Sequence, residues 1–191
     1  MTVPVMHPRP GHLRAVAEQI ERATGLRVEI LGGSLVMSPT HRGKHAGTIR
    51  RLRQQIEARM PTGLAAYEVS SIQMPDDDDD YCTPDLVVLP EAWDDDDDWF
   101  ADPHDVELAV EVISKTEKAQ QITDKNGWYS AAGVCMLLSV DPRYGRWALY
   151  THPKDGTYHG QLDGTYGDVI PLPEPFGFSL DSGCLPRYGR D

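Results

Sequence analysis

Two short apolar runs that each carry one carboxylate constrain the fold of this chain most strongly. Asp85 directly precedes the run Leu86–Leu89, and Glu111 lies inside the run Leu108–Ile113. Runs of this length, rich in Val, Leu and Ile, predict strands that are buried on both faces. An unpaired carboxylate is costly there, so it needs a cation, a hydrogen-bond donor or water beside it. Two carboxylates near one strand end predict a site for a hard divalent cation with oxygen ligands.

The polar segment after the second run predicts a helix over residues 118–132. Lys125 and Tyr129 lie four positions apart in this segment, so they share one helix face. A lysine presented near the two carboxylates would supply positive charge to a phosphate. Asp85, Glu111 and Lys125 together therefore indicate metal-assisted hydrolysis of phosphodiesters. The alternative is that Lys125 is an ordinary surface lysine.

The whole pattern predicts one domain over residues 1–191, of the α/β (α+β) class, with a mixed β-sheet flanked by helices. Its 191 residues, 40% of them hydrophobic, suffice for one sizeable core. Residues 1–9 are expected to form a loose arm, and the C-terminus from Val169 is expected to be irregular. The predicted elements are helices over residues 11–24, 41–60 and 118–132, hairpins over 27–38 and 153–166, and strands over 65–74, 82–89, 106–113, 134–140 and 147–152.

The net charge of −12 argues at first against a nucleic-acid partner. Ten of those charges, however, lie in the tracts Asp76–Asp80 and Asp94–Asp98, which leaves a net charge of −2 on the rest of the chain. The segment His41–Met60 contains six basic residues against the single acid Glu57. One helix could therefore contact a polyanion, and the alternative is a solvated helix face.

The two aspartate tracts are expected to form solvated loops that are dispensable for folding, because adjacent like charges repel. They lack the spaced ligands of a calcium-binding loop, although a calcium- or protein-binding module built on them stays an alternative function. The loop over residues 91–104 also carries aromatic side chains, which are expected to anchor it to the core: Trp93, Trp99 and Phe100.

Several short motifs follow one another in a set order along the chain: Val28-Glu29-Ile30, Gly33, Met37–Thr40, His45, Pro84-Asp85, Glu111–Ser114, Lys125, Tyr129, Ala131–Val134 and Val140–Arg143. In this order they resemble the Uma-two family of putative restriction endonucleases, which is part of the PD-(D/E)XK nuclease superfamily. The resemblance covers residues 10–182 and implies a restriction-endonuclease-like fold. It also implies an enzyme that hydrolyses phosphodiester bonds of DNA.

The resemblance implies that Asp85 and Glu111 hold Mg²⁺ or Mn²⁺, helped by the main-chain carbonyl of Val112. Lys125 would then complete the catalytic set by orienting the attacking water or stabilising the developing charge. Three further residues would have supporting roles: Glu29, His45 and Tyr129. Glu29 could complete the metal shell, or it could be a solvent-facing strand residue. His45 could equally be a structural histidine.

The chain departs from the pattern at two positions. Ile113 stands where the superfamily has a lysine, and the resemblance implies that this lysine has moved to the helix as Lys125. Gln121 stands where relatives usually place an aspartate, four residues before the lysine. If that aspartate orients the lysine, activity is weakened here. The alternative function is therefore a catalytically weak or inactive nuclease fold that acts as a binding or structural module.

Cellular location and assembly follow from weaker signals. No apolar run approaches the length of a membrane span, and the N-terminus lacks the pattern of a secretion signal. Cys82, Cys135 and Cys184 are odd in number and far apart, which indicates reduced thiols in a cytoplasm. Symmetric cutting of a duplex needs two active sites, so a homodimer is compatible with the chemistry.

Overall fold

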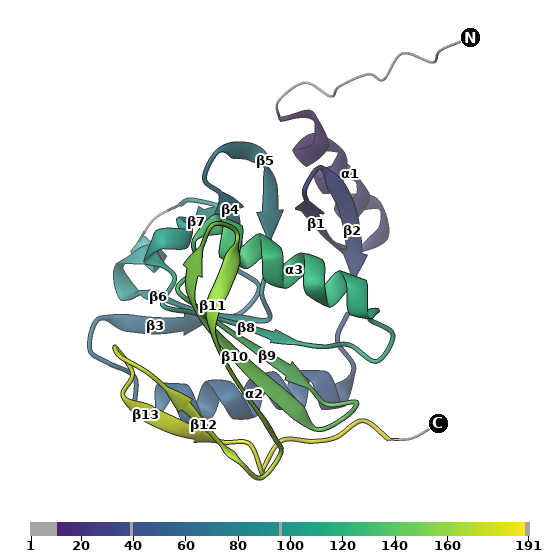
Figure 1. Ribbon diagram of the computed structural model, residues 1–191. Helices are drawn as coiled ribbons and strands as arrows, with labels where there is room; N and C mark the ends of the chain where they lie inside the picture. The colour runs from purple at the N-terminus through teal and green to yellow at the C-terminus, as the bar shows by residue number, and fades with distance from the viewer. Residues whose placement is uncertain (1–10, 39, 96, 190–191) are drawn as a thin grey trace.

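A six-stranded mixed sheet runs through the middle of the protein (Figure 1), which is described here from a computed structural model over residues 11–38, 40–95 and 97–189. The predicted arm over residues 1–9 lies outside the described residues. The strand order of this sheet is β11-β10-β9-β8-β6-β3. Of its five pairs of neighbouring strands, β8 and β9 run parallel and the other four pairs run antiparallel. The strands are β3 (Leu64–Tyr67), β6 (Leu86–Pro90), β8 (Leu108–Val112), β9 (Met136–Asp141), β10 (Arg146–Lys154) and β11 (Thr157–Thr165).

A second, smaller sheet lies beside the first and has the order β2-β1-β5-β4-β7. Its strands are β1 (Arg27–Leu31), β2 (Ser34–Ser38), β4 (Ser71–Met74), β5 (Asp77–Cys82) and β7 (Phe100–Ala101). The α-helices are α1 (His12–Thr24), α2 (Gly43–Glu57) and α3 (Ala119–Ala132), and two short 3₁₀ helices are η1 (Glu91–Asp95) and η2 (Pro103–Asp105). The predicted mixed sheet flanked by helices is confirmed.

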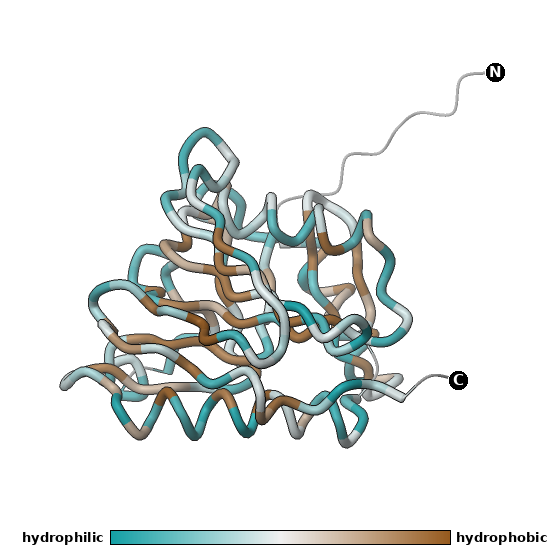
Figure 2. Tube along the Cα trace, turned by 60° about the horizontal axis from the view of Figure 1, so that its bottom comes forward, coloured by the Kyte–Doolittle hydropathy of each residue, from teal (hydrophilic) through white to brown (hydrophobic). Residues whose placement is uncertain are grey.

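The inner strands β6, β8 and β9 of the central sheet are buried on both faces, as their apolar runs predict. Along β6, Leu86 and Val88 pack with α2, whereas Val87 and Leu89 pack with α3. This alternation follows from the two-residue period of a strand. Figure 2 shows the consequence, because hydrophobic residues gather in the middle of the molecule and hydrophilic ones lie along its outer turns. Helix α3 therefore lies over one face of the sheet and α2 over the other.

Four element predictions were wrong. The hairpin predicted over 153–166 is instead one strand, β11, which pairs along its length with β10. The strand predicted over residues 65–74 is two strands in different sheets, β3 and β4, separated by Val69 at a φ of 61°. The strand predicted over 82–89 is divided between β5 and β6, because Pro84 has no N–H to donate to a strand neighbour. The C-terminus is not irregular: β12 (Val169–Leu172) and β13 (Phe178–Asp181) form an antiparallel pair that packs into the core on the α2 side.

The tract Asp76–Asp80 was expected to be a solvated loop, and this was wrong. Four of its five residues belong to strand β5. Asp79 and Asp80 are buried, with 8% and 5% of their surface exposed. The Asp79 carboxylate accepts the N–H groups of Gly11 and Arg14 at 2.9 and 3.2 Å, which caps the start of α1. Buried carboxylates that are hydrogen-bonded in this way support the fold.

Asp80 joins β5 to two other elements. Its carboxylate accepts the Gly32 N–H at 2.7 Å and the Trp128 indole N–H at 2.8 Å. The expectation that this tract is dispensable is therefore wrong for Asp79 and Asp80. In the second tract, by contrast, Asp94, Asp95, Asp97 and Asp98 are exposed, as expected.

The aromatic residues of the 91–104 loop divide into two groups. The Trp93 ring packs edge-on against Tyr67, with 5.0 Å between ring centroids, and the Phe100 ring lies 5.1 Å from that of Tyr81. Trp93 and Phe100 therefore anchor the loop. Trp99 is 75% exposed, which contradicts the anchoring role expected for it. Among the described residues, none of the helices is long and apolar enough to cross a membrane.

Candidate active site

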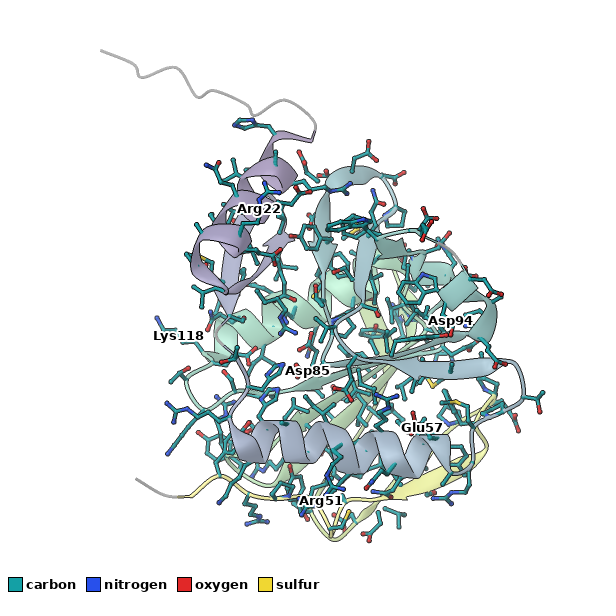
Figure 3. The ribbon with its side chains drawn as sticks, turned by 180° about the vertical axis from the view of Figure 1, so that it is seen from behind. Arg22, Arg51, Glu57, Asp85, Asp94 and Lys118 are labelled. Atoms are coloured by element: carbon teal, nitrogen blue, oxygen red, sulfur yellow. The ribbon has the colours of Figure 1, made fainter. Side chains whose placement is uncertain are left out.

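Asp85 lies at the start of β6, directly across from Glu111 on β8. The register pairs Leu86 with Val110, and the Asp85 N–H donates to the Val110 carbonyl at 3.0 Å. Cross-strand partners project to the same face, which here is the face covered by α3. The Asp85 carboxylate turns toward the strand end, where its Oδ2 accepts the Val112 N–H at 2.8 Å. Figure 3 shows Asp85 in the middle of the molecule, between α2 and α3.

Lys125 and Tyr129 both reach Glu111, as their spacing of one helical turn predicts. Lys125 Nζ lies 2.9 Å from Glu111 Oε1, and the Tyr129 hydroxyl donates to the same oxygen at 2.6 Å. Lys125 Nζ also lies 3.1 Å from Glu29 Oε1. The lysine is therefore not a surface residue but a buried cation shared by two glutamates from different sheets.

Glu29 is fully buried on β1, so the reading of it as a solvent-facing residue was wrong. Its Oε1 accepts the Thr83 N–H at 2.9 Å in addition to facing Lys125. The Cys82 thiol lies between the two glutamates, 3.2 Å from Glu29 Oε1 and 4.0 Å from Glu111 Oε1. The thiol's position could not be inferred from the sequence, because it depends on how the two sheets meet.

Burial and charge set the protonation of this cluster. Burial is the largest influence on Glu111 and raises its pKa to about 7, with the charges of Asp85 and Glu29 adding to the effect and Lys125 and Tyr129 opposing it. Burial acts in the same direction on Glu29, but the charges of Lys125 and Arg27 outweigh it and lower the pKa of Glu29. Glu29 is thus ionised at neutral pH, whereas Glu111 is partly protonated at neutral pH.

The same balance keeps Lys125 charged. Burial on its own would lower the pKa of Lys125, but the charges of Glu111 and Glu29 raise it well above the ordinary lysine value. A lysine in this state is an electrostatic group and not a general base. It can stabilise negative charge that develops on a substrate.

Two histidines hold the Asp85 carboxylate from the other side. His45, in the first turn of α2, places Nε2 3.0 Å from Asp85 Oδ2, and its Nδ1 lies 3.2 Å from the Tyr188 hydroxyl. His41 places Nε2 3.3 Å from Asp85 Oδ1, and the two imidazoles stack at 4.1 Å. Burial would raise the pKa of Asp85, but His45, Arg27 and His41 together lower it. His45 thus contacts Asp85, which the sequence predicts to be a metal ligand.

Sequence reasoning missed three of these neighbours. His41 lies four residues before His45, and this spacing was the signal that could have found it. Arg27 lies two residues before Glu29 on the same strand face, and its Nη1 is 3.8 Å from Asp85 Oδ1. Tyr188 carried no signal, because it comes from the C-terminal segment through a contact far apart in the sequence.

Gln121 does not contact Lys125 through any described hydrogen bond. Its side-chain oxygen accepts the Lys118 N–H at 2.9 Å, which caps the start of α3. Lys125 is instead oriented by Glu111 and Glu29. An aspartate at position 121 is therefore not needed to orient the lysine in this chain.

Many of these groups border one cavity of about 1210 Å³, although Glu29, Cys82 and Tyr129 are not among its lining residues. Its walls include Asp85, Glu111 and Lys125 from the predicted catalytic set, and also Val112, whose carbonyl was predicted to assist a metal. Besides Lys125, the lysines and arginines at the cavity are Arg27, Arg42, Lys44 and Lys115. Within the described residues, two buried carboxylate oxygens have no hydrogen-bond donor: Glu29 Oε2 and Asp85 Oδ1.

Comparison with known proteins identifies the family and supports the fold. The family model Uma2, described as "Putative restriction endonuclease", matches residues 15–183. The chain belongs to this family. A crystal structure of a putative nuclease of DUF820 from Anabaena variabilis ATCC 29413 has the same fold, with a TM-score of 0.67 and 16% sequence identity. The match covers 85% of this chain and 90% of that one. No curated protein matches the chain.

Proposed function

We propose that this Uma2 protein is a metal-dependent endonuclease that hydrolyses phosphodiester bonds of DNA, with Mg²⁺ or Mn²⁺ as its cofactor. The observation that carries the proposal is a buried acidic cluster in which Glu111 and Glu29 share Lys125, with Asp85 across from Glu111 at the border of a large cavity. Buried carboxylates that share one lysine destabilise a fold unless another cation joins them. Clusters of buried charged groups with shifted pKa values are typical of active sites.

The residues fit a divalent cation with oxygen ligands. Asp85 Oδ1 and Glu29 Oε2 are buried without a donor among the described residues, and the described bonds to Glu111 all end on Oε1. Asp85 and Glu111 would hold the ion with the carbonyl of Val112, and Glu29 would complete its shell. When bound, the ion supplies positive charge that polarises a phosphodiester and acidifies a water.

The remaining side chains have separate tasks in this proposal. The Lys125 ammonium, fixed by two glutamates, stabilises charge that develops on the phosphate. Tyr129 keeps the Glu111 carboxylate in place through its 2.6 Å hydrogen bond, and His45 does the same for Asp85 at 3.0 Å. These two are positioning residues, because each acts through a carboxylate.

The N-terminus of α2 supports a polyanionic substrate. This helix begins at the cavity, has no acidic residue in its first turn and has no side chain capping it, so its free N–H groups favour an anion. Arg42 and Lys44 border the cavity at the same place. Farther along the helix, Arg53 pairs with Glu57 and Glu68. Arg42 and Lys44 therefore place positive charge beside the free N–H groups at the cavity end of α2.

Separate variants test the division of roles. Lys125→Ala should retain metal affinity and lose about 10²–10³ in cleavage rate, as is typical for loss of one electrostatic group. Asp85→Ala should lose both metal binding and activity. Calorimetric titration of Mg²⁺ gives the affinities, and nicking of supercoiled plasmid gives the rates. Equal loss of metal affinity in both variants would contradict these roles.

The alternative function is an inactive nuclease fold that binds a partner. It is preferred if the wild-type protein cuts no duplex DNA, single-stranded DNA or RNA with either metal. We place the protein in the cytoplasm, since Cys82, Cys135 and Cys184 are all free thiols. A homodimer would allow symmetric cutting of a duplex, and sedimentation of the DNA-free protein measures it.

A further inference from the structure

The proposed function gives no role to His41, which stacks on His45 and also faces Asp85. His41, His45 and Asp85 each offer a ligand atom, and these three atoms lie within 4.8 Å of one another. None of the three belongs to the cluster of Glu29, Glu111 and Lys125. One histidine is enough to hold a carboxylate in place. Here two stacked histidines both turn Nε2 toward Asp85.

The hydrogen bonds of His45 fix which of its nitrogens carries a proton. The Tyr188 hydroxyl has one proton, and it donates this proton to the Ile113 carbonyl at 3.0 Å, which can only accept. Toward His45 Nδ1, at 3.2 Å, Tyr188 must therefore accept. Nδ1 carries the proton, and in a neutral imidazole Nε2 then has a lone pair.

This lone pair points at a second acceptor, because Nε2 lies 3.0 Å from the Asp85 carboxylate oxygen Oδ2. Two acceptors at this distance repel each other unless a positive species lies between or beside them. An added proton on His45 is one solution, and a metal ion bound by both groups is the other. A histidine that donates Nδ1–H to a fixed acceptor and turns Nε2 to a shared site has the arrangement usual for metal ligands.

The second histidine and the second carboxylate oxygen favour the metal. His41 Nε2 lies 3.3 Å from Asp85 Oδ1, and Oδ1 is buried without a hydrogen-bond donor among the described residues. Ligand atoms at about 2.1 Å from an ion are separated by roughly 3.0–3.4 Å along the edges of an octahedron or tetrahedron. The two nitrogen–oxygen distances have this length.

Arg27 is the one nearby cation that opposes a metal ion. Its Nη1 lies 3.8 Å from Asp85 Oδ1 but makes no hydrogen bond within the described part of the chain. The guanidinium is therefore held near Asp85 by charge and not by a hydrogen bond from Nη1, and it borders the open cavity. It can move toward the cavity when an ion binds.

We propose that His41, His45 and Asp85 form a binding site for a divalent transition-metal ion, which shares Asp85 with the carboxylate site of the proposed nuclease but uses two imidazoles in place of Glu111 and Glu29. Two imidazoles and one carboxylate suit Zn²⁺, Co²⁺ or Ni²⁺, whereas Mg²⁺ prefers oxygen ligands alone. The site does not depend on the proposed function, because an ion can bind there whether or not the protein cuts DNA.

Cobalt is the probe, because histidine-bound Co²⁺ has visible absorption bands that report its ligands. Untagged protein, stripped of metals with a chelator, is titrated with Co²⁺. The wild type should develop these bands with one equivalent, and Zn²⁺ but not millimolar Mg²⁺ should remove them. His41→Ala should weaken Co²⁺ binding by at least about 100-fold, since loss of an indirect partner already costs 10–100-fold.

The matched control is His159→Ala, because His159 is exposed on β11 and lies outside the cavity. It should bind Co²⁺ like the wild type. Glu111→Gln separates the two proposals: it should keep the cobalt bands and lose Mg²⁺-dependent DNA cleavage. His41 is only partly buried, so its variant should unfold at the wild-type temperature, which is measured in parallel. Absence of bands in the wild type, or equal Co²⁺ affinity in folded His41→Ala, would overturn the site.

Discussion

Replacing Lys125 with methionine is expected to destabilise the protein strongly in the absence of metal. The Lys125 ammonium lies 2.9 Å from Glu111 Oε1 and 3.1 Å from Glu29 Oε1, and all three side chains are buried. Removing one partner of a buried ion pair typically costs about 3–5 kcal/mol. Glu111 can take up a proton, since its pKa is already about 7, which keeps the cost near the lower end. We expect about 3 kcal/mol.

For a chain of this size that loss lowers Tm by about 10 °C. Thermal and urea unfolding in EDTA measure it. The matched control is Lys154→Met, because Lys154 is exposed at the end of β10, and it should change Tm by no more than about 1–2 °C. Adding Glu111→Gln to Lys125→Met should restore about 1–2 kcal/mol, since the double variant no longer buries that charge.

Metal ions should also restore part of the loss. An ion bound to Asp85 and Glu111 would replace the missing positive charge, so Mg²⁺ should raise the Tm of Lys125→Met more than that of the wild type. The reasoning would be refuted if Lys125→Met were as stable as Lys154→Met in EDTA. It would be refuted equally if Glu111→Gln made the lysine variant less stable still.

Three further results are expected. Asp79→Ala should cost about 1–2 kcal/mol of stability because it removes the cap of α1, whereas Asp97→Ala should be neutral, and urea unfolding of both tests this. Glu111 has a pKa of about 7 in the folded protein and 4.5 ordinarily, so the stability that its proton contributes is complete below pH 4.5 and is lost by pH 7. In EDTA, the stability of Glu111→Gln relative to the wild type should therefore rise by about 3 kcal/mol between pH 4.5 and pH 7, and a difference that does not change with pH would contradict the shift. Gln121→Asp should leave the DNA cleavage rate within about threefold of the wild type, because this side chain caps α3, and a large gain would show that a carboxylate there does orient the lysine.

The sequence predicted the central strands well because their burial shows in composition. The run Leu108–Ile113 has no polar residue except Glu111, and β8 is buried along its whole length. The prediction from sequence failed where strands that are consecutive along the chain belong to different sheets. Residues 65–74 have apolar residues on both sides of Val69, and this pattern did not reveal the change there from β3 to β4.

Charge was the least reliable local signal. Five successive aspartates indicate solvent, yet Asp79 and Asp80 are buried because N–H groups of α1, of the turn at Gly32 and of Trp128 meet them. Such donors come from distant parts of the chain, so no pattern within the tract could reveal them. The tract Asp94–Asp98 has the same composition and is exposed in its described residues.

The candidate site was predicted in part for similar reasons. Lys125 and Tyr129 could be paired from their helical spacing, and the structure places both on Glu111. Arg27 and Tyr188 could not, because their positions depend on how the small sheet and the C-terminal segment meet the central sheet.

Nicking of supercoiled plasmid by the wild-type protein, with Mg²⁺ or Mn²⁺ against EDTA, tests whether the protein is a metal-dependent nuclease. Asp85→Ala, purified in parallel, controls for contaminating nucleases. We expect nicking by the wild type that requires the metal and is absent in Asp85→Ala. Nicking that persists in EDTA, or that Asp85→Ala retains at the wild-type rate, would contradict this expectation.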